Sequence, residues 1–92
     1  MFTHPHPDQA DRQSYRARRS APDHLPAFPH AIRIRPESGR VLWREPDGTL
    51  LEWDDHDGAL EMYGVHGWHL GEYDPVTGGN LKVAEPGRRL RA

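Results

Sequence analysis

The chain is short, strongly charged and free of cysteine. Its 92 residues are 35% hydrophobic and 28% charged, with a mean hydropathy of −0.92 and a formal net charge of −2. These values predict one small domain with a thin core, exclude disulfides and thiolate metal sites, and leave no apolar run long enough for a membrane span. We also expect no secretory signal, because the first residues lack a basic segment followed by an apolar run.

Residues 1–31 are predicted to be an N-terminal arm or linker. They are rich in proline, histidine and arginine and show no sustained periodicity. Such a segment buries too little apolar surface to offset the entropy lost on ordering. The stretch DQADRQSYRARRS can form a short helix with Asp8 as its N-cap. We therefore expect a mobile arm that carries at most this helix.

Residues 32–92 show the pattern of a small, mainly β domain. RVLWRE and TLLEWD flank PDG, which indicates a hairpin, and ALEMYGV, WHLGEYD and NLKVAE follow between turn residues. These five runs predict one highly twisted antiparallel meander that is covered on one face only. The predicted core residues are Trp43, Leu51, Trp53, Leu60, Leu70 and Leu81.

Charge is distributed unevenly along the chain. Residues 1–44 carry a net charge of +4, residues 45–81 carry −9 with no lysine or arginine, and residues 82–92 carry +3. Basic ends around an acidic centre can hold a polyanion while the centre acts on it. From charge alone, basic tails without such a role are the simpler interpretation.

The acidic centre contains candidates for acid–base chemistry. Side chains alternate along a strand, so Glu52 and Asp54 share the face opposite Leu51 and Trp53. If HDG is a tight turn, Glu61 faces the Asp54 side across the ladder. Two close carboxylates repel, which raises the pKa of one toward neutrality. Spacing alone favours the alternative, a solvated acidic turn with ordinary pKa values.

A small metal-binding domain is a further hypothesis. DDHD and HGWH offer oxygen and imidazole ligands, but the ligand pattern of a calcium loop is incomplete. His66 and His69 could share a zinc ion only with two more ligands. We therefore expect no metal and no other cofactor, and we expect His69 to be a histidine on the sheet surface.

Five motifs follow one another in residues 43–92: LEWD, LEMY, HLGEYDPVTG, NLK and GRR. Together they resemble the C-terminal ribonuclease domain of the E-type colicins that attack ribosomes, and of related pyocins. A long run of mixed residue types is more specific than one short motif. The resemblance implies a metal-independent toxin endoribonuclease that cuts the 16S ribosomal RNA of the small subunit in the decoding region. Attack by a ribose 2′-hydroxyl would leave a cyclic phosphate.

The resemblance also implies roles for individual residues. The family's catalytic aspartate and glutamate match Asp54 and Glu61, and its essential arginine matches Arg88. We expect Glu61 to be the general base, Asp54 to orient its neighbours and Arg88 to clamp the phosphate. The family's catalytic histidine falls on Asp57, beside His56. Either could donate the proton to the leaving oxygen, and we favour His56 because imidazole titrates near neutrality.

Partners follow from the same resemblance. We expect Lys82, Arg89 and Arg91 to bind RNA, the ribosome to be the substrate, an acidic immunity protein to block the nuclease, and the cytoplasm to be the site of action. Colicins carry this domain behind import and receptor domains, so we expect a released module, a stand-alone toxin or a relative with another use. The alternative is a non-catalytic RNA- or protein-interaction module that kept the fold.

Overall fold

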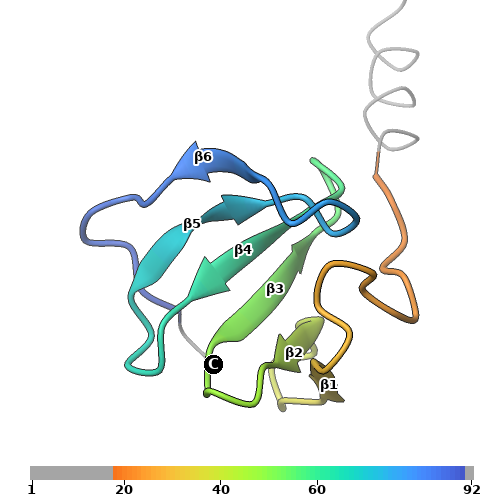
Figure 1. Ribbon diagram of the computed structural model, residues 1–92. Helices are drawn as coiled ribbons and strands as arrows, with labels where there is room; N and C mark the ends of the chain where they lie inside the picture. The colour runs from red at the N-terminus through yellow and green to blue at the C-terminus, as the bar shows by residue number, and fades with distance from the viewer. Residues whose placement is uncertain (1–17, 91–92) are drawn as a thin grey trace, which may run out of the picture.

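The computed structural model describes residues 18–90, which form one antiparallel sheet (Figure 1). Within this range its strands are β1 (Ile32–Ile34), β2 (Leu42–Arg44), β3 (Leu50–Asp54), β4 (Ala59–Tyr63), β5 (His69–Tyr73) and β6 (Asn80–Val83). Each strand pairs with its neighbour in sequence, so the order across the sheet is β1-β2-β3-β4-β5-β6. The predicted mainly β meander is confirmed, and β1 adds a strand to the five expected.

The core lies on one face of the sheet, beneath residues 18–31. Leu25 from this segment is buried against Trp43, Leu51 and Leu60, which come from β2, β3 and β4. Burying such side chains contributes about 1.5–3 kcal/mol each. In Figure 1 the segment runs beside β1, β2 and β3.

Hydrogen bonds also hold the described part of the N-terminal segment. The backbone N–H of Arg19 donates to the carbonyl of Asp55 at 2.7 Å, and the indole Nε1–H of Trp53 donates to the carbonyl of Arg19 at 2.8 Å. Residues 18–31 are therefore packed, where we expected part of a mobile arm, because Leu25 buries apolar surface despite the polar composition around it. Most of the predicted helix after Asp8 lies outside the described residues, and the domain boundary at residue 31 stays a prediction.

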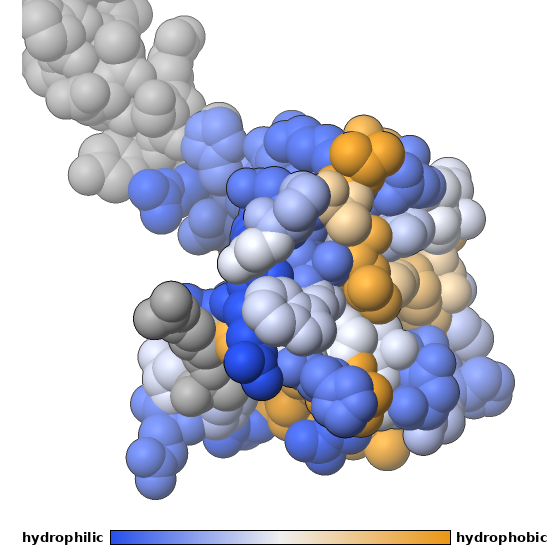
Figure 2. All heavy atoms as spheres, turned by 90° about the vertical axis from the view of Figure 1, so that its left-hand side faces the viewer, coloured by the Kyte–Doolittle hydropathy of each residue, from blue (hydrophilic) through white to orange (hydrophobic). Residues whose placement is uncertain are grey.

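Two predicted core residues are on the surface. Leu70 is 43% exposed and Leu81 is 52% exposed, whereas Trp43, Leu51 and Leu60 are buried and Trp53 is half-buried against the core. The covering segment packs on β2, β3 and β4, which leaves apolar side chains of β5 and β6 in solvent. Figure 2 looks at the side of the molecule where β5 and β6 lie and shows apolar residues reaching the surface among polar ones.

The turn between β3 and β4 positions the acidic face. Gly58 has a positive φ of 66°, which favours glycine, and its N–H donates to the carbonyl of Asp54 at 2.8 Å. The Asp54 side chain also accepts hydrogen bonds from the backbone N–H groups of His56 at 3.0 Å and Asp57 at 3.2 Å. The predicted tight turn is present, and Asp54 holds it closed.

Among residues 18–90 we find no helix, hence none long and apolar enough to cross a membrane.

Candidate active site

A pocket of about 430 Å³ opens on the sheet face opposite the core. Its walls come from β3, β4, β5 and β6, from the turn after β3 and from the segment after β6. The lining residues are Asp54, Asp57, Glu61, His69, Glu72, Lys82, Val83, Glu85 and Arg88. The structure thus brings together five of the residues predicted from sequence. His56 is not among the lining residues.

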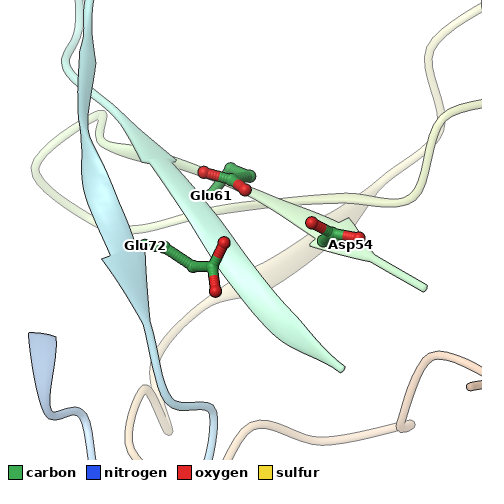
Figure 3. A group of neighbouring side chains, drawn as sticks. All are labelled: Asp54, Glu61 and Glu72. Carbon is green, nitrogen blue, oxygen red and sulfur yellow. The ribbon is translucent and has the colours of Figure 1, made fainter. Parts of the chain in front are cut away.

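The pairing of the strands explains why the acids meet. Glu61 on β4 lies directly opposite Glu52 on β3 and Glu72 on β5, and Glu72 lies opposite Lys82 on β6. Directly opposite residues have Cβ atoms about 4.5–5.5 Å apart. Carboxylate oxygens of Asp54, Glu61 and Glu72 all lie within 4.8 Å of one another (Figure 3). The face that the sequence predicted for Asp54 and Glu61 is confirmed.

Glu61 is buried and paired with a histidine. The Nε2 atom of His69 lies 2.7 Å from Oε1 of Glu61, and both side chains are more than nine-tenths buried. The backbone N–H of Glu85 donates to Nδ1 of the same ring at 2.9 Å. Because Nδ1 accepts this bond, Nε2 carries the proton and donates to Glu61. His69 therefore fixes the position of the Glu61 carboxylate.

A bulge brings His69 and Glu72 to the same face. Along β4, Met62 pairs with Gly71 but Tyr63 pairs with His69, so one residue of β5, Leu70, has no partner. Without the bulge, two residues three positions apart would point to opposite faces. We expected His69 on the sheet surface and did not select Glu72. A glycine inside a strand pattern is the signal that could have revealed the bulge.

Arg88 reaches the site from the segment that follows β6. Its Nη1 atom lies 2.9 Å from Oε1 of Glu85 and 3.7 Å from Oε1 of Glu61. Its guanidinium also lies over the ring of Tyr63, 5.8 Å from the centroid. Its carbonyl accepts a hydrogen bond from the backbone N–H of His69 at 2.9 Å, which ties this segment to β5. Arg88 thus places a permanent positive charge beside Glu61.

Asp57 and His56 form a chain that ends at Lys82. Oδ1 of Asp57 lies 3.1 Å from Nδ1 of His56, and Oδ2 lies 3.2 Å from Nζ of Lys82. The hydrogen bond with His56, followed by that with Lys82, lowers the pKa of Asp57 below its ordinary value. The His56 side chain is 72% exposed. Asp57 is therefore held as an anion at the pocket wall.

Glu72 has the opposite electrostatic environment. Burial, together with the neighbouring Glu61, raises the pKa of Glu72 from 4.5 to about 7, although Lys82, 3.7 Å away, opposes this. A buried carboxyl beside another carboxyl is costly to ionise. Glu72 therefore holds its proton at a pH where most carboxyl groups have lost theirs.

Arg89, which was predicted to bind RNA, is not among the residues that line the pocket. The guanidinium of Arg89 lies 5.0 Å from the ring centroid of Trp68, and its Nε donates to the carbonyl of His66 at 3.2 Å. Arg91 lies outside the described residues. Both ring nitrogens of His69 are engaged within the protein, so a zinc site shared with His66 would require breaking these bonds. The roles predicted for the site residues stay predictions.

The part of the chain that forms the sheet and the pocket is similar to known proteins. A family profile described as Cytotoxic matches residues 19–91. Colicin E3 of Escherichia coli is 35% identical over 71 residues, which is 75% of this chain and 13% of colicin E3. Colicin-E6 and cloacin, also of Escherichia coli, are 39% identical over 54 residues and 42% identical over 43. These matches cover 56% and 46% of this chain, and 10% and 8% of the relatives. The chain therefore spans a small fraction of the relatives' length.

Proposed function

Because this chain belongs to the Cytotoxic family, the ribonuclease domain of the E-type colicins, we propose that it is a metal-independent endoribonuclease of the toxin type. Its proposed substrate is the 16S ribosomal RNA of the small subunit, cut in the decoding region. The reaction is attack of a ribose 2′-hydroxyl on the adjacent phosphate, which leaves a cyclic phosphate. Such chemistry requires a base, an acid and a cation for the charge that develops on the phosphate.

Glu61 is the proposed base. It lines the pocket, and the hydrogen bond from His69 fixes one of its oxygens in place beside the space where a 2′-hydroxyl would bind. A carboxylate held in place by a buried neighbour loses little orientation on binding a substrate. The ordered Glu61–His69 pair beside Arg88 is the observation that carries the proposal.

Arg88 and Lys82 are the proposed phosphate ligands. Both line the pocket, from the segment after β6 and from β6 itself. Arginine presents a planar fork that matches two phosphate oxygens, and lysine adds a point charge. These two cations supply the positive charge for which other nucleases use metal ions. Asp54 is proposed to act indirectly, because its side chain closes the turn that carries Asp57.

Cleavage of ribosomes tests this function. Purified protein should cut the 16S ribosomal RNA of bacterial ribosomes at one position, which primer extension maps to the decoding region, with a cyclic phosphate on the upstream fragment. Glu61→Gln, which preserves size and removes the base, should reduce cleavage by about 10²- to 10⁴-fold. Wild-type protein that folds but leaves ribosomal RNA intact would overturn the proposal.

We also propose the ribosome as the intracellular target, the cytoplasm as the site of action and an acidic immunity protein as the natural inhibitor. The similarity to colicin E3, colicin-E6 and cloacin supports these partners. Co-expression with a candidate inhibitor should restore growth to cells that the active protein kills.

A non-catalytic interaction module is the second candidate function. The pocket contains five carboxyl groups, from Asp54, Asp57, Glu61, Glu72 and Glu85, against the two cations. Such an excess of negative charge weakens the attraction of a phosphate backbone. The ribosome assay separates the two functions, because a module of this kind binds without cutting.

A further inference from the structure

Resting on the proposed function, we propose that Glu72 is the general acid of this nuclease. In this assignment Glu72 protonates the 5′-oxygen that leaves the phosphate, while Glu61 accepts the proton of the attacking 2′-hydroxyl. Both residues would thus be catalytic, and the two directly opposed glutamates of β4 and β5 would form one acid–base pair.

The geometry of Glu72 fits this role. It lies opposite Glu61 across the β4–β5 ladder and lines the same pocket. Figure 3 shows its carboxyl group reaching from β5 over β4, toward Glu61 and Asp54. The side chain is 5% exposed, so bulk water has little access to its proton. A substrate phosphate held by Arg88 and Lys82 would lie within reach of both glutamates.

The groups that surround Glu72 keep it protonated. It faces Glu61 on β4, Lys82 on β6, and Asp54 and Asp57 at the end of β3 and in the turn that follows. Three of these four neighbours are acids, and the lysine is shared with Asp57. Burial and Glu61 accordingly raise its pKa to about 7. A catalytic acid works best with a pKa near the working pH.

His56 and Asp57, the two proton donors predicted from the sequence, are less well placed than Glu72 to protonate the leaving oxygen. His56 does not line the pocket, and its exposed ring is directed to Asp57. Asp57 lines the pocket, but His56 and Lys82 lower its pKa and hold it as an anion. A carboxylate without a proton cannot donate one. Glu72 is therefore the better proton donor among the described residues that line the pocket.

Glu61 and Glu72 together account for every proton that moves in the cleavage step. Glu61 takes the 2′-hydroxyl proton, the 2′-oxygen forms a bond to phosphorus, and the bond from phosphorus to the 5′-oxygen breaks. Glu72 gives its proton to that oxygen, so the products are a 2′,3′-cyclic phosphate and a 5′-hydroxyl. Glu61 is then protonated and Glu72 ionised. Transfer of one proton from Glu61 to Glu72 restores the starting state without any other reactant.

Substitutions in the 92-residue chain test the assignment. Glu72→Gln keeps the size of the side chain and should reduce ribosome cleavage by about 10²- to 10⁴-fold. Glu52→Gln is the matched control, because Glu52 also lies opposite Glu61 but pairs with Arg40 outside the pocket lining. The control should cut within about threefold of wild type, whereas Glu72→Gln cutting as fast as the control would overturn the assignment. A loss in His56→Ala as large as that in Glu72→Gln would also overturn it.

Two further readouts separate an acid from a structural residue. Wild-type cleavage should decline above about pH 7 as the donor ionises, and Glu72→Gln should lack this decline. On a decoding-region RNA in which sulfur replaces the leaving 5′-oxygen, the leaving thiolate needs no proton. The defect of Glu72→Gln should shrink at least about tenfold there, while that of Glu61→Gln persists. An undiminished Glu72→Gln defect would refute the acid role alone, whereas wild-type protein without any cleavage would refute the proposed function itself.

Discussion

Glu72→Gln should make the folded protein more stable at alkaline pH. In the folded chain the pKa of Glu72 is raised from 4.5 to about 7, chiefly by burial and then by Glu61. Because the folded value lies above the unfolded one, the folded state binds the proton more tightly. The associated stability is fully present below about pH 4.5 and is lost as the pH rises through 7. A tenfold change in proton affinity corresponds to about 1.4 kcal/mol, so ionising Glu72 costs about 3 kcal/mol at pH 8.

Urea denaturation followed by tryptophan fluorescence measures this cost. The free energy of unfolding of Glu72→Gln minus that of wild type should become more positive by about 3 kcal/mol between pH 4.5 and pH 8, because glutamine does not ionise. Glu52→Gln, the neighbouring control, should show no comparable change. If the difference in free energy of unfolding between Glu72→Gln and wild type stays constant from pH 4.5 to pH 8, Glu72 is not a buried carboxyl that holds its proton near neutral pH.

Other outcomes follow from the site and the core. Cleavage of a decoding-region RNA should continue in excess chelator, and activity that vanishes and returns with a divalent ion would support a metal site instead. Arg88→Lys should cut about 10²-fold more slowly or worse, because lysine lacks the fork. Arg89→Lys should change cleavage little, because Arg89 lies over Trp68 outside the pocket lining and lysine keeps its positive charge. Leu25→Ala should lower the free energy of unfolding by about 2–5 kcal/mol in urea titrations, and Leu70→Ala by under about 1 kcal/mol. Equal losses of stability in the two variants would contradict the packing of Leu25 in the core.

Alternation and turn chemistry predicted most of the sheet. The PDG and HDG turns define two hairpins, and a period of two then places Asp54 and Glu61 on one face and Leu51 and Leu60 on the other. These arguments need only local residues, so a single sequence contains enough information for them. Arg88 came from the resemblance to the colicins, since no periodicity connects it to the sheet.

Tertiary features account for what the sequence did not reveal. Leu25 is separated from the strands it covers by prolines and charged residues, and its burial depends on contacts with Trp43, Leu51 and Leu60. A period of two fails at Leu70, where the bulge reverses the expected faces. The shifted pKa of Glu72 arises from burial and from a neighbour on another strand. No window of consecutive residues contains that information.

The unpaired Leu70 lets β5 tolerate a change in length that would disturb a regular strand. Its side chain is exposed, so many substitutions at this position should be neutral. Deleting Leu70 would remove the bulge and leave His69 and Glu72 two positions apart, so both side chains would stay on the same face. One more residue inserted between His69 and Gly71, with the bulge kept, would instead move His69 to the face opposite Glu72. A three-nucleotide deletion at Leu70 should therefore preserve the Glu61–His69 pair, whereas an insertion of the same length should break it.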